Sequence, residues 1–246
     1  MPAAIEVRGL VRRFGSRTAL DGIDLVVPDG DLHGLIGPNG AGKTTTLRCI
    51  CGLVGRDTGS VEVRGADPEE DPRQVRDVIG LMPQEHCLYG DLSIGENLSF
   101  FGRLFGLDRK TFRDRTARLM EITRLGPFWD RRASKLSGGM YKKLALSCAL
   151  LHRPPMLLLD EPTNGVDPVS RRELWDLLYE LGEEGTTVLV ATAYLDEAER
   201  CHRTTLLSEG RVVATGEPFD LTREVGASSF EEAFLIYTET ERGSDR

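Results

Sequence analysis

The chain contains the segment Gly37-Pro38-Asn39-Gly40-Ala41-Gly42-Lys43-Thr44, which matches the pattern GxxxxGK[ST] and dictates the architecture around it. An apolar run at residues 32–36 precedes the segment, and a run compatible with a helix, residues 45–53, follows it. A strand, a glycine-rich turn and a helix in that order form the context in which this motif binds anions. An ordinary glycine-rich turn is the alternative, and the motif together with its flanks disfavours it.

The residue types in this loop suit phosphate groups. Glycines let the backbone curl so that successive N–H groups point inward, and the following helix adds its positive N-terminal end. Lys43 supplies a mobile positive charge, and the Thr44 hydroxyl is a hard oxygen ligand of the kind that Mg²⁺ prefers. The residues expected to bind nucleotide phosphates are Gly37, Pro38, Asn39, Gly40, Ala41, Gly42, Lys43, Thr44 and Thr45.

Apolar patterning separates two kinds of strand. Continuous apolar runs that end in polar or glycine-rich loops are typical of strands buried in a parallel sheet. Segments that alternate apolar and polar residues are typical of half-exposed strands, here in an antiparallel edge sheet. The continuous runs are residues 32–36, 156–159 and 187–191, and the alternating segments are residues 5–10, 23–27 and 61–63.

Two other parts of the chain have a helical pattern. Residues 91–150 carry apolar side chains at helical spacing, for example Phe112 and Leu119, and indicate a helical subdomain inserted into an α/β core. Near the C-terminus, residues 229–235 indicate a short amphipathic helix. The last residues, 239–246, are polar enough to fray.

These patterns predict one α/β domain over residues 1–246, with a P-loop NTPase core of the RecA-like type, an antiparallel β edge subdomain and an inserted helical subdomain. A chain with 40% hydrophobic residues can bury such a core. We expect the core and its edge sheet in residues 1–90 and 151–220, the helical subdomain in 91–150, and a C-terminal helix with a polar tail in 221–246.

Composition and charge narrow the class of function. The formal net charge of -8 has the wrong sign for neutralising a nucleic-acid backbone, so we expect no nucleic-acid partner. No apolar run approaches the roughly 20 residues that cross a bilayer, and the first residues lack the pattern of a secretion signal. We therefore expect an intracellular chain with no direct membrane insertion. Its five cysteines form no CxxC pair, and the odd number favours reduced, partly buried thiols.

Two adjacent acids follow the apolar residues 157–159. Asp160 is placed to hold the water shell of Mg²⁺, and Glu161 to reach an attacking water. Because side chains alternate along a strand, such neighbours can take different roles. A pair of acids that merely begins a loop is the alternative. The phosphate loop and the acids alone do not separate kinases, GTPases, helicases and transport ATPases.

The segment Leu136-Ser137-Gly138-Gly139-Met140 places Ser137 24 residues before Glu161 (161 − 137). With it, the sequence resembles the ATP-binding cassette (ABC) ATPase family, whose signature reads LSGGQ. The resemblance covers nearly the whole chain: Phe14 sits where the family stacks an aromatic ring on adenine, Gln84 at its Q-loop, and Asn164-Gly165-Val166-Asp167 at its D-loop. It implies ATP as the nucleotide, catalysis by Glu161, Gln84 and Lys43, and Mg²⁺ held by Thr44, Gln84 and, through water, Asp160.

The resemblance also implies a head-to-tail dimer with a second cassette, identical or different. Ser137, Gly138 and Gly139 of one cassette would close over ATP held by the P-loop of the other. A serine hydroxyl and glycine N–H groups at the start of a helix over residues 139–151 make a second anion-binding end. An ordinary helix N-cap is the alternative interpretation of these residues.

Three further segments, residues 163–168, 194–199 and 230–235, look most like the ABC-2 type exporters, which include drug-efflux ATPases. In those systems the ATPase docks on the cytoplasmic face of a separate transmembrane subunit, through a cleft bordered by the Q-loop and the helical subdomain. The resemblance therefore implies a peripheral position on the inner face of the cell membrane. Candidate cleft residues, if they are not simply core, are Leu88, Tyr89, Leu92, Phe100 and Phe101.

The sequence departs from the family pattern at two positions. Ala193 replaces the switch histidine, and the loss of one preorganised donor at a developing charge costs on the order of 10²–10³ in rate. ATP binding should survive while hydrolysis slows. Two alternatives to an ordinary ATPase stay open: a degenerate cassette beside a histidine-bearing partner, and an ATP-binding scaffold that hardly hydrolyses. Met140 replaces the signature glutamine, and we expect it to pack in the helical subdomain with little effect.

A soluble ABC protein that acts on chromosomes or ribosomes is a further alternative. Chromosome-type members insert long coiled coils between P-loop and signature. Here 94 residues separate Lys43 from Ser137 (137 − 43), and no heptad tract lies between them. The spacing favours a transport ATPase.

Overall fold

The computed structural model describes residues 3–84 and 87–244. Within these residues the central element is a six-stranded sheet in the order β5-β6-β7-β3-β8-β9. The first five strands in that order pair in parallel, and β9 joins the edge antiparallel to β8. The strands are β3 (Leu32–Ile36), β5 (Ile79–Met82), β6 (Met156–Asp160), β7 (Thr187–Thr192), β8 (Arg203–Ser208) and β9 (Arg211–Gly216).

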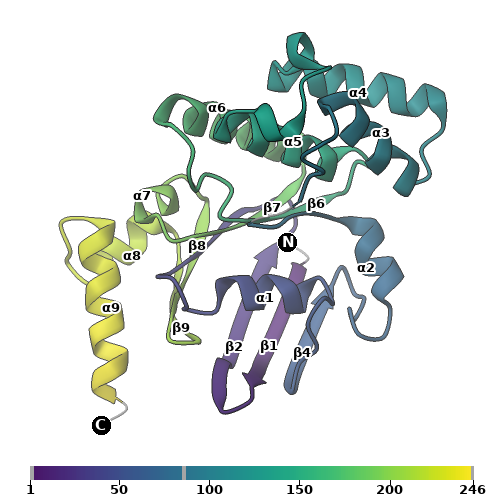
Figure 1. Cartoon of the computed structure of the whole chain (residues 1–246). Coiled ribbons are helices and arrows are strands. Elements are labelled where there is room, and N and C mark those ends of the chain that lie inside the picture. The colour runs from purple at the N-terminus through teal and green to yellow at the C-terminus, as the bar shows by residue number, and fades with distance from the viewer. Residues whose placement is uncertain (1–2, 85–86, 245–246) are drawn as a thin grey trace.

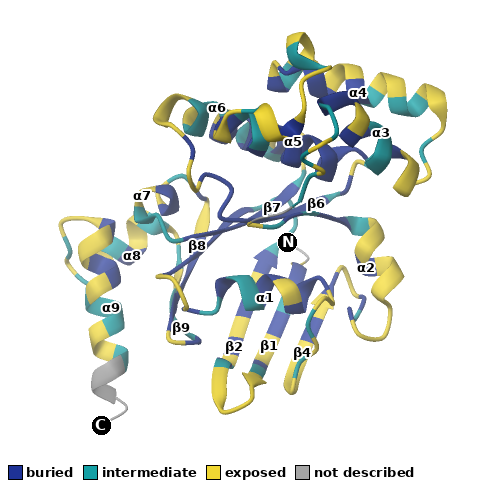
Figure 2. Ribbon diagram, viewed as in Figure 1, coloured by how far each residue is buried: buried dark blue, intermediate teal, exposed yellow. Residues whose placement is uncertain are grey.

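The predicted buried strands all lie in this sheet. Every residue of β3, β6 and β7 is buried, and they form the dark centre of the molecule in Figure 2. The register pairs Ile36 with Thr192, and Asp160 with Ala191. The carboxyl ends of the three strands therefore meet at one edge, where ligands bind in open parallel sheets.

A second sheet has the order β2-β1-β4 and is antiparallel. Its strands are β1 (Ala3–Phe14), β2 (Arg17–Pro28) and β4 (Thr58–Val63). This confirms the predicted antiparallel edge sheet and, with the parallel sheet, the α/β fold class. The first two strands extend beyond the alternating segments because their pairing continues to the hairpin turn, where Phe14 pairs with Arg17.

Helix α1 (Lys43–Ile50) follows the phosphate loop and lies between the two sheets (Figure 1). It contacts β2 and β4 of the antiparallel sheet, and β6 and β7 of the parallel sheet. Leu47 and Ile50 are fully buried there. The start of α1 is thus held from both sides. A short helix, α2 (Pro72–Val78), leads into β5.

Helices α3 (Ile94–Leu104), α4 (Arg109–Thr123) and α5 (Gly138–Leu150) lie between β5 and β6 in the chain, and they gather with α6 (Pro168–Glu183) at the top of Figure 1. Helix α5 is mostly buried and packs on α3, α4 and α6, so it joins the group to the core. The chain forms 3₁₀ turns at Gly126–Phe128 and Ala133–Lys135, between α4 and α5.

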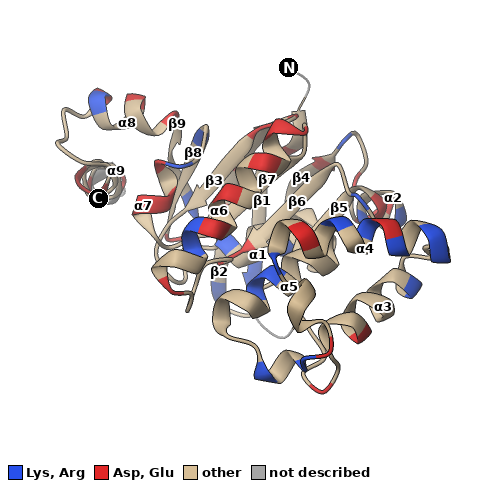
Figure 3. Cartoon of the chain, turned by 90° about the horizontal axis from the view of Figure 1, so that it is seen from above, with Lys and Arg blue, Asp and Glu red and all other residues tan. Residues whose placement is uncertain are grey.

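The outer side of this helical group is polar. Figure 3 shows Lys and Arg interspersed with Asp and Glu along α4, whose exposed positions include Arg113, Asp114 and Arg118. In the described part of the chain, no helix combines the length and the apolar character that a membrane crossing requires.

The C-terminal helices are α7 (Leu195–Ala198), α8 (Pro218–Glu224) and α9 (Phe230–Ser244). The predicted helix is present, but α9 continues through residues 239–244, which we expected to fray. Ser229 Oγ accepts from the Glu232 N–H, and Phe230 and Phe234 are buried against the neighbouring elements. Because a helix propagates more easily than it nucleates, these anchored first turns extend into the polar segment.

Candidate nucleotide-binding site

The loop between β3 and α1 has a shape that glycine alone permits at two points. Gly42, the N-cap of α1, has φ +111°, in the left-handed region. A β-carbon at Gly42 would lie 2.7 Å from Leu20 Cδ2, and one at Gly37 would overlap the carbonyl oxygen of Leu207. The loop is therefore pressed between β2 and β8, and these neighbours fix its conformation.

The first turn of α1 offers backbone donors. The first N–H groups of any helix have no acceptor within the helix. Here no side chain of the described residues caps them. Together with the partial positive charge of the helix end, they form a site for an anion such as a phosphate group.

Lys43 is buried beneath the loop, with 5% of its side chain exposed. Its Nζ donates to the carbonyl oxygens of Gly37 (2.8 Å) and Pro38 (3.2 Å). The same Nζ lies 3.1 Å from Glu161 Oε1. The structure thus brings the predicted lysine into direct contact with the acid that follows β6.

Thr44 and Asp160 meet beside this ion pair. Thr44 Oγ1 donates to Asp160 Oδ1 at 3.1 Å. Burial raises the pKa of the Asp160 carboxyl, while the Thr44 hydrogen bond opposes the shift. Two hard oxygens therefore lie next to the anion site, while the roles of Thr44 and Asp160 in holding Mg²⁺ stay predictions.

Glu161 is held in an uncommon conformation directly after β6. Its φ is +50°, in the left-handed region that side chains other than glycine seldom adopt. Its N–H donates to the Ala191 carbonyl at 2.8 Å, and the Ala193 N–H donates to its Oε2 at 3.3 Å. Such strain is characteristic of functional positions, where the surroundings hold a side chain at one place.

Ala193 contacts the Glu161 carboxylate through its main-chain N–H, and its assignment to the position of a switch histidine stays a prediction. Its methyl group offers no donor, and its main-chain N–H is already bonded to Glu161. The residue therefore positions the acid but brings no side-chain donor toward a phosphate.

The sequence did not indicate Lys142, a buried residue of α5. Its Nζ donates to the Gln84 carbonyl at 3.1 Å and to the Glu161 carbonyl at 3.2 Å. One ammonium group thus links the helical group to the segment after β5 and to the end of β6. The sequence offered only the pair Lys142-Lys143 ahead of a largely apolar run, which does not tell which of the two lysines is buried.

Gln84 follows β5, and its side chain is exposed at the surface. Among the contacts of the described residues, its carbonyl oxygen is the group that reaches the site, through Lys142. The proposed roles of its side chain in catalysis and metal binding stay predictions.

The predicted signature and D-loop residues form a second cluster. Ser137 caps α5, and its Oγ accepts from the Met140 N–H at 3.3 Å, so the ordinary N-cap interaction is present. A β-carbon at Gly138 would lie 2.8 Å from the Gly165 carbonyl oxygen. Asp167 caps α6 through the N–H groups of its first turn, and these bonds lower its pKa.

Phe14 ends β1 at the hairpin, and 48% of it is exposed. The Arg12 guanidinium carbon lies 4.7 Å from the centre of its ring. Arg12 is in turn paired with Asp57, with Nη1 and Oδ1 3.4 Å apart. A supported aromatic ring with exposed area suits the predicted stacking against a base.

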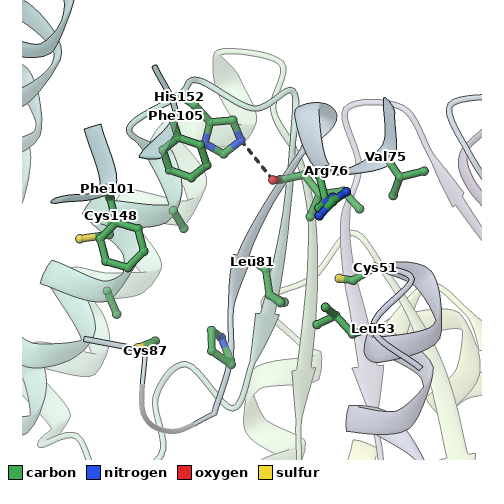
Figure 4. A pocket seen from close by; sticks show the side chains of 14 residues that line it. Cys51, Leu53, Val75, Arg76, Leu81, Cys87, Phe101, Phe105, Cys148 and His152 are labelled. Carbon is green, nitrogen blue, oxygen red and sulfur yellow. Dashed lines mark hydrogen bonds between the residues drawn. The ribbon is translucent and has the colours of Figure 1, made fainter. Parts of the chain in front are cut away.

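A cavity of about 390 Å³ separates α3 and α5 from α1 and α2 (Figure 4). Its walls include Leu53, Leu81, Phe101 and Phe105, which come from distant parts of the sequence. The His152 ring stacks on Phe105 with centroids 4.1 Å apart. The cavity is apolar, open at the surface and adjacent to the segment that carries Gln84.

The structure separates the five residues suggested as cleft candidates. Phe101 lines the cavity, whereas Leu92 and Phe100 line a different groove with Arg103. Tyr89 packs edge-on against Phe100 at 4.6 Å, and Leu88 packs on the core of the helical group. The five residues predicted from the sequence therefore include cavity, groove and core residues. Their positions in the sequence do not show in which direction each side chain points.

All five cysteines are free, as predicted. Cys51, Cys87 and Cys148 line the cavity wall. Burial raises the pKa of Cys51 to about 12. Such thiols behave as small apolar side chains.

These elements define the class of protein, which is a P-loop nucleotide-binding domain. Two acids at the end of β6 contact the phosphate loop, and the neighbouring helix α5 begins with a serine cap and two glycines. A family model described as ABC transporter matches residues 20–164, a span that contains the loop, the signature and both acids. The chain belongs to the ABC transporter family.

Two relatives indicate the branch of the family. The probable multidrug ABC transporter ATP-binding protein YbhF of Escherichia coli (strain K12) is 45% identical over 230 residues, which is 93% of this chain and 40% of that protein. The Nod factor export ATP-binding protein I of Paraburkholderia xenovorans is 41% identical over 231 residues, 93% of this chain and 76% of that protein. The chain thus spans less than half of the first relative. The predicted resemblance to exporter ATP-binding proteins is confirmed.

Solved structures agree on the fold. The ATP-binding subunit of an ABC transporter superposes with a TM-score of 0.86 and 31% identity, covering 96% of this chain and 99% of that one. A dimeric ATP-binding cassette in a post-hydrolysis state, bound to ADP and Pi, gives a TM-score of 0.77 and 26% identity, covering 87% and 98%. The predicted fold class is therefore confirmed.

Proposed function

We propose that the chain binds Mg-ATP and, as a dimer, couples ATP binding and hydrolysis to a transmembrane export subunit. One observation carries the proposal: the phosphate loop touches both acids at the end of β6, through Lys43 with Glu161 and Thr44 with Asp160, each at 3.1 Å. A charge, a hydroxyl and two carboxylates at the end of a parallel sheet are the parts that phosphoryl transfer requires.

Mg²⁺ fits the donors present. Thr44 Oγ1 and Asp160 Oδ1 are hard oxygens held next to one another. No group of three or more His, Cys, Asp or Glu side chains in the described residues forms a closed metal site. Mg²⁺ keeps several waters and takes few protein ligands beside phosphate oxygens, so Thr44 with Asp160 acting through water suits it.

Within the site, each residue has a separate task. Lys43 and the N–H groups of the loop would bind the β- and γ-phosphates. Glu161, held by the Ala193 N–H, would orient the attacking water and accept its proton. Gln84 is proposed to couple the metal site to the cavity. Its carbonyl oxygen and that of Glu161 accept hydrogen bonds from the same Lys142 ammonium group.

The second cassette would complete the site. Ser137, Gly138 and Gly139 lie at the start of α5, beside the loop that carries Asp167. A helix start with a serine hydroxyl favours the γ-phosphate of ATP bound to a partner cassette. The dimeric relative bound to ADP and Pi supports this arrangement.

The cavity beside Gln84 is the proposed docking place for the transmembrane subunit. Its apolar walls, Leu53, Leu81, Phe101 and Phe105, suit a short apolar segment of that partner. Docking there would keep the chain in the cytoplasm, on the inner face of the cell membrane.

A degenerate cassette is the second candidate, and Ala193 favours it. Without a side-chain donor at this position, the γ-phosphate loses one contact in the transition state. The chain would then bind ATP, hydrolyse it slowly and depend on a histidine-bearing partner cassette. If hydrolysis were negligible, the chain would be a scaffold that binds ATP without turning it over.

Calorimetric titration of the purified chain with Mg-ATP, together with a turnover assay, tests the proposal. We expect ATP binding that Lys43→Ala removes, and turnover that Glu161→Gln abolishes. A wild-type chain that folds but does not bind ATP would overturn the proposal. Turnover as fast as that of ordinary family members would rule out the degenerate cassette.

Retention of the tagged chain in the membrane fraction of its own cells tests docking. We expect Phe101→Asp to release the chain into the soluble fraction, because a buried charge spoils an apolar contact. Leu104→Asp is the matched control, since Leu104 lies on the same helix but is exposed and outside the cavity. Equal retention of both variants, with unchanged melting temperatures, would contradict docking at the cavity.

A further inference from the structure

The hairpin that ends in Phe14 also brings an arginine to the phosphate loop. Gly15 and Ser16 connect β1 to β2, and Phe14 pairs with Arg17 across the turn. β2 runs beside the loop between β3 and α1, where a β-carbon at Gly42 would lie 2.7 Å from Leu20 Cδ2.

Two contacts establish how closely β2 approaches the loop. A β-carbon at Gly42 would lie 3.0 Å from the Ala19 carbonyl oxygen. A β-carbon at Gly40 would lie 3.5 Å from Arg17 Nη2. The guanidinium of Arg17 therefore stands beside the fourth residue of the motif, on the side where the hairpin carries Phe14.

Arg17 differs from the arginines around it. Arg12 pairs with Asp57, Arg64 with Asp29, and Arg211 with Asp21. Arg17 is exposed, and its side chain has no hydrogen-bond partner and no carboxylate partner among residues 3–84 and 87–244. A positive charge without a counter-charge thus lies next to a loop built to hold anions.

The position fits one part of an extended nucleotide. With the base on Phe14 and the terminal phosphates in the loop, the ribose and the α-phosphate cross the space between them, next to Arg17. We infer that Arg17 is a further nucleotide-binding residue that donates to the α- and β-phosphate oxygens of ATP. The inference rests on the proposed binding of ATP and adds a residue that the P-loop motif does not contain.

The chemistry of the guanidinium group decides what a substitution does. Arginine presents a planar set of donors that matches two phosphate oxygens at once, whereas lysine is a point charge. Removing one exposed, charge-assisted contact is expected to weaken binding about five- to tenfold. The loss should apply to ATP and ADP alike, because both carry the α- and β-phosphates.

Titration calorimetry with ATP and with ADP on the full chain provides the test. We expect Arg17→Ala and Arg17→Gln to raise both dissociation constants about five- to tenfold, and Arg17→Lys to lie between them and the wild type. Added NaCl should weaken ATP binding less in Arg17→Ala than in the wild type, because a screened contact has gone. Arg13→Ala, an equal change of charge at another exposed position of the same hairpin, should leave both constants unchanged.

The outcomes separate this inference from the proposed function. Equal affinities in the wild type, Arg17→Ala and Arg17→Gln, with unchanged melting temperatures, would overturn the role of Arg17 and leave ATP binding intact. Equal losses in Arg17→Ala and Arg13→Ala would overturn it as well, since they would show a general charge effect. A wild-type chain that binds neither nucleotide would overturn the proposed function and this inference together.

Discussion

Lys43 Nζ lies 3.1 Å from Glu161 Oε1, and both side chains are almost fully buried. Removing one partner of such a pair leaves the other charge buried without compensation. The two partners are not equivalent. Lys43 keeps the carbonyl oxygens of Gly37 and Pro38 when Glu161 is neutralised. Among the described residues, the Glu161 side chain keeps only the Ala193 N–H when Lys43 is removed.

The ion pair gives the first prediction. Lys43→Met should lower the free energy of unfolding by about 3 kcal/mol, and Glu161→Gln by clearly less. Urea unfolding of the three proteins measures the difference. A Glu161→Gln variant that loses as much stability as Lys43→Met would contradict this asymmetry.

Ala193→His should raise Mg-ATP turnover. The imidazole would restore a donor beside Glu161, and one preorganised donor is worth on the order of 10²–10³ in rate. We expect at least a tenfold increase in kcat, with the dissociation constant of ATP little changed. Ala193→Leu, which adds bulk without a donor, is the control. An increase in both variants, or in neither, would show that the missing donor is not what limits hydrolysis.

Gly37→Ala should damage folding. Its β-carbon would overlap the backbone oxygen of Leu207, which no rotation of a side chain can relieve. We expect a loss of roughly 2 kcal/mol or more in the free energy of unfolding. Gly182→Ala is the matched control, because Gly182 lies in α6 with open space around its β-carbon position, and alanine should stabilise that helix by about 0.5–1 kcal/mol. Two variants of equal stability would refute the steric argument.

Asp160 should make the fold less stable as pH rises. Burial raises its pKa in the folded chain above the ordinary value of 3.8, so the folded state holds a proton that the unfolded state has already released. The penalty is absent below pH 3.8, grows as pH rises toward the folded pKa and is complete above it. Asp160→Asn should therefore be more stable than the wild type at pH 7, with a gain that shrinks toward pH 4. Urea unfolding at both pH values measures this, and a gain independent of pH would contradict the assignment.

Lys142→Met should cost more than Lys143→Met, although the two lysines are neighbours. The first leaves two carbonyl oxygens, the partly buried one of Gln84 and the buried one of Glu161, without this donor, at a cost of about 2 kcal/mol. The second breaks an ion pair with the partly exposed Glu173, which is worth less than about 1 kcal/mol. We also expect Lys142→Met to lower kcat more than ATP affinity. Identical unfolding curves for the two variants would contradict the prediction.

The parts of the fold that depend on contiguous residues could be predicted from the sequence. The phosphate loop, the buried strand before Asp160 and the caps at Ser137 and Asp167 are local, because neighbouring residues supply most of their hydrogen bonds. The extension of α9 was missed, since it depends on packing of Phe234 against other elements.

Contacts between distant segments could not be predicted. Lys142 reaches Gln84 and Glu161 across 58 and 19 residues, and no spacing rule connects them. The cavity wall at Leu53, Leu81 and Phe105 combines three segments that carry no common motif. The family resemblance drew attention to Ala193, but its hydrogen bond to Glu161 joins positions 32 residues apart and follows from no local pattern.

The placement of α1 between two sheets has a consequence for the energetics of recognition. A loop that orders only when its ligand arrives loses conformational entropy at that moment, and affinity falls accordingly. Here β2, β4, β6 and β7 hold the helix, and Leu207 and Leu20 hold the turn before it. That entropy has been lost during folding, so the binding of a nucleotide does not bear the cost of ordering this loop.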